Sequence, residues 1–513
     1  MIRHLKNLLR LIRISFILAK HDALFLLEEL KIAPVLVKSA GIIAAVHSAK
    51  GRPGERMVRA FYELGPTFIK LGQALSTRSD LLGENITADL AILQDKMPAF
   101  SSIEARRIIE SELGKKIDEI FAEFDDAPVA AASIAQVHSA RDLLGNKIAV
   151  KILRPGIEAD FARDIEMLLW AAEITEGRIP KRLKAREVVQ TFSESIKLEL
   201  DLRMEAAAAS EMAENFAADS EFRIPRVDWQ RTSRRVLVTE WIEGISIANK
   251  EGLIAAGHDL YAITAKAASA MFKQILRDGF FHADMHPGNL FIDENGNIAA
   301  VDFGIMGRVD SATRRYLAEM LYGFFKRDYM KVAEVHFDAG YVPKGQSIEL
   351  FAQACRGVGE PILGLPQNKI SIAKLLGQLF KITEDFQMET QPQLLLLQKT
   401  MMLTEGIGRS LTPDINMWIL TEPLIEDWAR ENMGAKARIS AAIEDFRHLA
   451  SGMHKLRGFM DNISSSIGPE GIKIHPASIE EMYLQKFAHN AKLFGMGFIL
   501  VMGLLVTVFL IKH

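Results

Sequence analysis

A chain of 513 residues, 49% of them hydrophobic and 25% charged, is long enough to bury a full core and to form two or three structural units. Its net charge of -3 at pH 7 argues against a general nucleic-acid-binding protein. The single cysteine, Cys355, excludes an internal disulfide framework and a thiolate metal cluster, so we expect the folded part to lie in a reducing compartment.

Residues 1–50 begin with a stretch in which basic and apolar side chains are interleaved. The basic ones are Arg3, Lys6, Arg10, Arg13 and Lys20. This pattern predicts a basic amphipathic helix that is too charged to cross a bilayer and that lacks the cleavage site of a signal peptide. We expect residues 1–50 to lie on an anionic membrane surface. The alternative is a helix that packs against its own domain.

Residues 51–115 are predicted as a helical extension, with a helical segment over 52–95 and a helix over 102–124. Lys70 and Gln73 are three residues apart, so on a helix they share one face and would act on one ligand or one carboxylate. Solvated surface is the alternative for such a pair.

Residues 116–243 have the strand pattern of an upper, nucleotide-binding lobe. Small side chains at Ala130, Ala131, Ala132 and Ser133 occupy the place of a glycine-rich loop, and they allow backbone N–H groups to approach a phosphate. Alanine is stiffer than glycine, so phosphates would sit differently from those in a typical kinase. The following strand, 148–152, carries Lys151, the expected partner of the α- and β-phosphates.

Residues 186–216 are predicted as one long helix that carries Glu199 and Glu205. At about 100° per residue, these carboxylates lie roughly 120° apart around the axis and cannot both reach one lysine. Glu205 is expected to pair with Lys151, and Glu199 with Lys70. A solvated acidic face with local ion pairs is the alternative.

An apolar strand over 235–242 breaks at Gly244, as the hinge between two lobes would. We expect backbone groups of Glu240 and Ile242 to bind the adenine edge of a nucleotide.

Residues 280–304 carry the chemistry expected of phosphoryl transfer. His282, Asp284 and Asn289 follow the order H-x-D-x-x-x-x-N, and the D-F-G triplet starts at Asp302. Asp284 would orient or deprotonate the acceptor, while Asn289 and Asp302 offer hard oxygen ligands for magnesium. Short strands over 289–293 and 298–301, joined by a turn at 294–297, would bring the two ligands together.

The rest of the lower lobe, 244–434, is predicted to be helical beyond the D-F-G triplet, without a second set of strands. A polar tail over 435–485 precedes a predicted membrane anchor over 486–513. Its uncharged run, 493–511, would span about 28 Å as a helix at about 1.5 Å per residue, close to a bilayer core. Lys486 and Lys492 precede this run and place the larger domain in the cytoplasm.

Taken together, the motifs resemble the UbiB family of atypical protein-kinase-like proteins, the coenzyme Q biosynthesis group. The matching residues are Lys70, Gly72 and Gln73 as K-x-G-Q, the alanine-rich loop, Lys151, Glu199 and Asp201 as E-x-D, Glu205, Asp284, Asn289 and Asp302. The resemblance implies an α+β, two-lobed kinase-like fold that binds ATP or ADP with magnesium and has ATPase activity. It further implies that the K-x-G-Q helix folds over the active site, where Lys70 and Gln73 meet Glu199 and occlude the space for a protein substrate.

The family is tied to ubiquinone production at membranes. The expected partners are therefore inner-membrane lipid and ubiquinone precursors or biosynthetic enzymes. Two other functions remain open from the sequence. One is a small-molecule phosphotransferase of the aminoglycoside or choline kinase type, against which the K-x-G-Q helix and the terminal span count. The other is a pseudokinase scaffold switched by nucleotide. Retention of Lys151, Asp284, Asn289 and Asp302 argues against lost nucleotide chemistry, though not against slow turnover.

Overall fold

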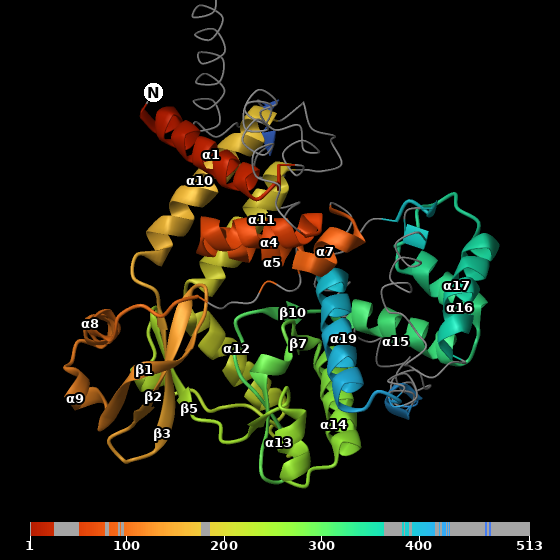
Figure 1. Ribbon diagram of the computed structural model, residues 1–513. Coiled ribbons are helices and arrows are strands. Elements are labelled where there is room, and N and C mark those ends of the chain that lie inside the picture. Colours follow the sequence, from red (N-terminus) through yellow and green to blue (C-terminus); the bar gives the residue numbers. More distant parts are fainter. Residues whose placement is uncertain are drawn as a thin grey trace, which may run out of the picture. The chain divides into compact units, whose positions relative to one another are not determined.

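The computed structural model divides into two compact units, Met1–Ala429 and Arg430–His513. The residues that it describes are 2–24, 51–76, 82–90, 93, 97–175, 185–363, 382–383, 385–388, 392–415, 420, 423–426, 428, 430, 467–468 and 471–472. In the second unit these residues form a short hairpin of β11 (Ile467–Gly468) and β12 (Gly471–Ile472). The site lies in the first unit (Figure 1).

The upper lobe is built on an antiparallel sheet in the order β1-β2-β3-β5. Its strands are β1 (Glu123–Ala131), β2 (Ala135–Arg141), β3 (Lys147–Leu153) and β5 (Val236–Glu240). Side chains alternate across a strand, and in β3 Ile148, Val150 and Ile152 pack beneath two helices. Lys151 therefore projects from the opposite face.

The two covering helices are α8 (Ser102–Leu113) and α9 (Ile117–Ile120). The single helix predicted over 102–124 is wrong. Gly114 adopts a left-handed conformation with φ of 67° and caps α8, because glycine reaches this region without a Cβ clash.

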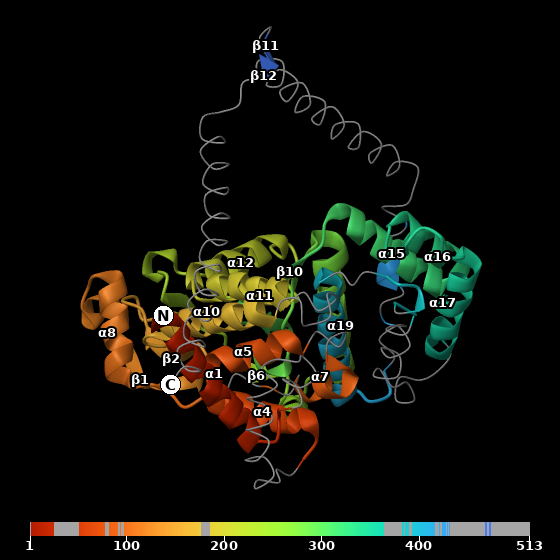
Figure 2. The same ribbon diagram turned by 90° about the horizontal axis from the view of Figure 1, so that it is seen from above.

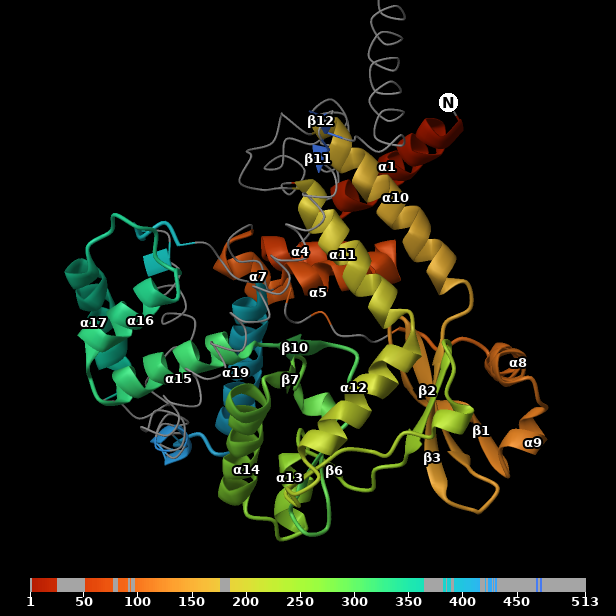
Figure 3. The ribbon, with the colours of Figure 1, turned by 180° about the vertical axis from the view of Figure 1, so that it is seen from behind.

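Three helices, α10 (Ile157–Thr175), α11 (Ala185–Glu199) and α12 (Leu202–Asn215), lie between β3 and β5 in the chain and pack on the other face of the upper sheet. The single helix predicted over 186–216 is also wrong, because the chain turns at Leu200 and Asp201 between α11 and α12 (Figure 3). Asp201 has extended backbone angles, and its carboxylate accepts the backbone N–H of Arg203 at the start of α12. An aspartate N-cap thus starts a new helix.

The N-terminal helices are α1 (Ile2–Lys20), α4 (Pro53–Leu64), α5 (Pro66–Leu75) and α7 (Glu84–Leu90), which confirms helical structure in the described part of 52–95. One face of α1 packs on its own domain, with Leu11, Ile14 and Leu18 buried and Arg10 paired to Asp164 of α10. The alternative prediction, a helix that packs against its own domain, is therefore confirmed for that face. Figure 2 shows α1 beside α4. The outer face of α1 differs, because four large apolar side chains on it are 40% to 60% exposed: Leu8, Leu9, Ile12 and Phe16.

The lower lobe combines short strands with helices. A second sheet has the order β4-β9-β8-β6, and β7 pairs with β10. These strands are β4 (Phe222–Arg223), β6 (Ile245–Ser246), β7 (Phe280–His282), β8 (Leu290–Ile292), β9 (Ile298–Ala300) and β10 (Met306–Arg308). Strand β10 directly follows the D-F-G triplet, and the described chain after it is helical up to residue 430, so the expected helical character is confirmed apart from that strand.

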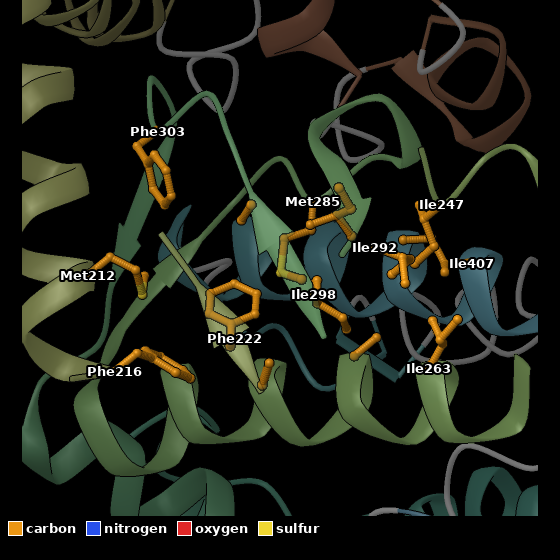
Figure 4. Packing of buried hydrophobic residues seen from close by; sticks show 14 of the residues in the cluster. Met212, Phe216, Phe222, Ile247, Ile263, Met285, Ile292, Ile298, Phe303 and Ile407 are labelled. Carbon is orange, nitrogen blue, oxygen red and sulfur yellow. The ribbon is translucent and has the colours of Figure 1, made fainter. Parts of the chain in front are cut away.

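Helices make up the rest of this lobe, and α14, α19 and a π-helical segment at Lys273–Asp278 contact its short strands. The helices are α13 (Lys250–Ala255), α14 (Leu260–Phe272), α15 (Ser311–Phe325), α16 (Tyr329–Asp338), α17 (Ile348–Leu363) and α19 (Pro392–Leu411), with a 3-10 turn at Pro287–Asn289; a second 3-10 turn, Trp229–Arg231, packs on β5 of the upper sheet. Figure 4 shows the core beneath the hairpin, where Phe303 and Met285 point among side chains from α12, α14 and β8. The D-F-G phenylalanine is thus an anchor for the site.

Within the described residues, no helix is both long and apolar enough to cross a membrane. The predicted span over 493–511 lies outside those residues. It stays a prediction.

Candidate nucleotide and phosphoryl-transfer site

The loop predicted to be catalytic, which carries Asp284, is held by a fully buried histidine, His282. The backbone N–H of His282 donates to Oε1 of Gln274 at 2.9 Å. Its Nδ1 accepts the backbone N–H of Asp284 at 3.1 Å, so Nε2, 3.3 Å from the carbonyl of Val301, carries the ring proton. Burial lowers the pKa of His282, which favours this neutral form. The imidazole thereby joins the loop that carries Asp284 to the strand that leads into Asp302.

The predicted hairpin is confirmed, with β8 paired antiparallel to β9. Asp293 stabilises the turn, because its carboxylate accepts the backbone N–H groups of Asn295 and Asn297. At the open end, the N–H of Val301 donates to the carbonyl of Asn289 at 2.9 Å. Asn289 and Asp302 therefore lie at the same end of the hairpin.

Asp302 has the left-handed backbone angle φ of 63°, which is uncommon for a residue with a side chain. Its Oδ1 lies 3.0 Å from Nζ of Lys151 on β3. The same ammonium contacts Oε1 and Oε2 of Glu205 on α12 at 2.8 and 2.9 Å. The predicted pair of Lys151 and Glu205 is confirmed, and one lysine bridges the upper and lower lobes.

One ammonium cannot fully compensate two carboxylates, and the pKa values of the three groups show this. Burial raises the pKa of Glu205 to about 7, although Lys151 opposes the shift. For Asp302 burial also acts upward, but Lys151 outweighs it and holds the pKa well below its usual range. Burial acts to lower the pKa of Lys151, and the two carboxylates outweigh it and raise that pKa.

Lys70 and Glu199 also meet as predicted. Nζ of Lys70 on α5 lies 3.0 Å from Oε2 of Glu199 at the end of α11, and both side chains are at most 10% exposed. Gln73, one turn further along α5, donates instead to the carbonyl of Leu93 at 3.3 Å. The prediction that Glu199 and Glu205 pair with two different lysines is correct, but its reason is wrong. It placed both carboxylates on one helix, whereas α11 ends at Glu199 and Glu205 lies on α12.

Close packing brings α5 to this position. A Cβ added at Gly72 would meet Cδ1 of Leu93 and lie 2.6 Å from the ring of Phe61, so a larger residue here would require these two side chains to move. The glycine of the K-x-G-Q motif thus has a packing role.

The alanine-rich segment lies at the turn between β1 and β2. Ala130 and Ala131 end β1, Ala132 donates its N–H to the carbonyl of Ala135 at 2.8 Å, and Ser133 is fully buried. The guanidinium of Arg154 donates to the carbonyl of Ala132 through Nε at 2.9 Å and Nη2 at 2.8 Å. These hydrogen bonds connect the turn to the residue that follows β3.

The expected hinge follows β5. The backbone N–H of Glu240 donates to the carbonyl of Arg226 at 2.8 Å, and its carboxylate pairs with Arg223. An adenine contact by Glu240 would therefore use its carbonyl oxygen. Ile242 is half-buried just beyond the strand. The adenine contacts of both residues remain predictions.

Comparisons with known proteins show the family to which the chain belongs. The ABC1 atypical kinase-like domain matches residues 92–336, and the UbiB helical domain matches residues 355–416. A protein of Marinobacter nauticus named "Probable protein kinase UbiB" is 42% identical over 446 residues, which cover 85% of this chain and 81% of the relative. A protein of the same name from Azotobacter vinelandii is 39% identical over 455 residues, covering 86% and 85%.

The chain belongs to the UbiB family. The family resemblance and the kinase-like fold with mixed α/β content are thereby confirmed. A solved structure titled "The complex structure of Rv3197-erythromycin from Mycobacterium tuberculosis" is 24% identical, with a TM-score of 0.47, and covers 76% of this chain and 96% of that chain.

One residue in contact with the candidate site was missed from the sequence. Nζ of Lys399 on α19 donates to Oδ1 of Asp284 at 2.9 Å. Burial acts to raise the pKa of Asp284, but Lys399 outweighs it and the pKa lies below its usual value. A lone lysine in a helix 115 residues downstream has no local spacing that would connect it to the catalytic loop.

The chemistry of the donors fits a magnesium ion bound together with nucleotide phosphates. Nδ2 of Asn289 donates to the carbonyl of Asp284 at 3.2 Å, so its amide oxygen is the group left for a cation. Asp302 adds a carboxylate that is 46% exposed. Among the described residues, no group of three or more acidic, histidine or cysteine side chains could hold a metal ion.

Proposed function

We propose that this UbiB protein is a magnesium-dependent atypical kinase-like ATPase that binds ATP or ADP and supports ubiquinone biosynthesis at a membrane. The observation that carries the proposal is the ammonium of Lys151, on the upper lobe, between Glu205 and Asp302, together with a lower lobe that presents Asp284 and Asn289. Together these side chains supply the parts that phosphoryl transfer requires.

Each side chain has a separate task in this proposal. Glu205 holds Lys151 in place for the α- and β-phosphates. Asn289 and Asp302 would bind magnesium, which supplies positive charge to the phosphate oxygens when it is bound. Asp284 accepts a hydrogen bond from the attacking hydroxyl or water, and neutral His282 fixes the loop that carries it.

The buried pair of Lys70 and Glu199 supports ATP hydrolysis over protein phosphorylation. It ties α5 to the end of α11, two residues before the helix that carries Glu205. We infer that α5 limits access of a protein substrate. The acceptor is then water or a small molecule.

The experiment is ATP hydrolysis by the purified protein with and without magnesium, together with quinone content in cells that lack it. Magnesium-dependent hydrolysis and a fall in ubiquinone, with accumulation of precursors, are the expected results. A protein that neither binds nor hydrolyses ATP would overturn the proposal.

Membrane association is part of the same proposal. The outer face of α1 exposes Leu9, Ile12 and Phe16 beside Arg13, and α1 contains no acidic residue. Such a face suits the interface of an anionic bilayer. With a span at 493–511, the kinase-like domain would be held at the cytoplasmic side of a bacterial inner membrane.

A further inference from the structure

Lys399 reaches the catalytic carboxylate from outside the kinase-like domain. It lies in the segment 355–416 that matches the UbiB helical domain, whereas Asp284 lies in the segment 92–336 that matches the kinase-like domain. The two side chains are 24% and 27% exposed, and Nζ is 2.9 Å from Oδ1. The helical domain therefore contributes a charged group to the site.

Packing fixes the helix that carries this lysine. Leu397 is buried with Phe281 and Ala283, which flank His282 on the catalytic loop. Thr400, the next residue after Lys399, is fully buried, and its hydroxyl donates to the carbonyl of Leu396 at 3.0 Å. Helix α19 also packs along α14, as Figures 1 and 3 show. Lys399 thus extends from a fixed backbone, unlike a lysine on a mobile surface.

The two oxygens of Asp284 have different surroundings. Oδ1 accepts from Lys399, whereas Oδ2 lies 3.9 Å from Nε2 of His286, beyond hydrogen-bond distance. A carboxylate held by one oxygen keeps the lone pairs of the other for an incoming hydroxyl or water. This asymmetry is what a base in phosphoryl transfer needs.

We propose that Lys399 is a positioning residue for phosphoryl transfer, which holds Oδ1 of Asp284 so that Oδ2 faces the attacking water or hydroxyl. This proposal rests on the ATPase function proposed above. In hydrolysis, the water oxygen bonds to the γ-phosphorus while the bond from that phosphorus to the β,γ-bridging oxygen breaks. ADP leaves with that electron pair, and the proton of the water passes to Oδ2 of Asp284.

The test compares kcat, KM and the Kd for ATP in variants of the full chain. Lys399→Met should lower kcat about 100-fold, because a misdirected base costs about that factor, while the Kd for ATP changes less than about threefold. Lys399→Arg keeps the charge and should recover most of the loss. Lys331→Met is the matched control, since Lys331 lies on α16, outside the site, and pairs with Glu319 and Glu334. It should leave kcat unchanged.

A double variant decides whether Lys399 acts through Asp284. Adding Lys399→Met to Asp284→Asn should change kcat by less than about threefold, since the group that Lys399 positions is already lost. Independent losses that multiply would overturn the proposal, as would normal kcat in Lys399→Met. If Lys399→Met fails to fold, Lys399→Gln takes its place as the neutral variant. Absence of ATP hydrolysis in the wild-type protein would overturn the ATPase function itself, a different result from wild-type activity that Lys399→Met leaves intact.

Discussion

Lys70 and Glu199 form an ion pair of 3.0 Å in which neither side chain is more than 10% exposed. A buried pair of this kind differs from a surface pair, because removal of one partner leaves the other charge desolvated. The contact between α5 and α11 therefore depends on both residues at once.

We expect Lys70→Met to lower the free energy of unfolding by about 3 to 5 kcal/mol, because it leaves Glu199 buried without its counter-charge. The double variant Lys70→Met/Glu199→Gln should recover part of the loss. Lys20→Met is the control, since Lys20 and Glu63 lie at a similar distance, 2.9 Å, but are 45% and 37% exposed. It should cost no more than about 1 kcal/mol. Denaturant unfolding measures the free energy of unfolding of the three variants. Equal decreases in Lys70→Met and Lys20→Met would contradict the prediction.

Asp302→Asn should abolish magnesium-dependent ATP hydrolysis. The substitution removes the charge of the carboxylate that is proposed to bind magnesium, while it preserves the shape of the side chain. It also removes one of the two carboxylates that face Lys151. Asp338→Asn, near the end of α16, is a control that changes the same atoms outside the site. Hydrolysis is measured across a magnesium titration, and an Asp302→Asn curve that matches wild type would refute the assignment.

The sequence predicted those parts of the site whose residues are close together or lie in recognisable motifs. The spacing from His282 to Asp302 and the turn at Asp293 were sufficient for the hairpin, because local hydrogen bonds determine it. The pairs of Lys151 with Glu205 and of Lys70 with Glu199 followed from matching each lysine to one carboxylate.

Other features depend on tertiary contacts that no local pattern records. Helix propensity continued across Asp201, yet its carboxylate satisfies the N–H of Arg203 and starts α12. Both faces of α1 carry apolar side chains, so periodicity did not indicate which face is buried. Lys399 reaches Asp284 only through the packing of α19.

The stability of the nucleotide-free protein should depend on the protonation of Glu205. Its pKa is about 7 in the folded protein against 4.5 as the unperturbed value, so between these pH values the folded state binds more protons than the unfolded chain. The corresponding stabilisation is complete below about pH 4.5 and is lost as the pH rises through 7. Glu205→Gln should remove this fall between pH 5 and 8.

The matched control for that measurement is Glu211→Gln, on the same helix, where the carboxylate is 39% exposed and pairs with Arg308. Unfolding free energies across the pH range should show the wild-type slope in Glu211→Gln and a flatter one in Glu205→Gln. The same slope in all three proteins would show that Glu205 is ionised throughout.

Deletion of residues 492–513 should release much of the protein from membranes, because it removes the long uncharged run. The remainder should be held by α1 and dissociate at high salt. Adding Ile12→Glu and Phe16→Glu should abolish this remainder, since both side chains lie on the exposed face of α1, whereas Ile103→Glu on α8 should not. Membrane flotation at low and high salt measures each form. If the protein that lacks residues 492–513 and carries both substitutions in α1 still floats at high salt, the chain contains another membrane anchor.

The alanine-rich turn differs most from the glycine-rich loop of ordinary kinases. Its carbonyl at Ala132 is held by Arg154, and its alanines permit fewer backbone conformations than glycine would. If this stiffness disfavours productive transfer, Ala131→Gly relaxes the turn and lets N–H groups approach the γ-phosphate. ATP should then bind more tightly relative to ADP, and quinone synthesis should fall.

The alternative for Ala131 is a packing role within the upper lobe alone. In that case Ala131→Gly would lower the free energy of unfolding by roughly 0.5 to 1 kcal/mol and leave nucleotide preference unchanged. Ala127→Gly, on the same strand but away from the turn, is the control for glycine in β1. Dissociation constants for ATP and ADP decide between the two roles. An ATP-to-ADP ratio that changes in Ala131→Gly but not in Ala127→Gly assigns the turn to nucleotide selection, whereas equal ratios in all three proteins remove it from the mechanism and leave phosphate binding to Lys151, Asn289 and Asp302.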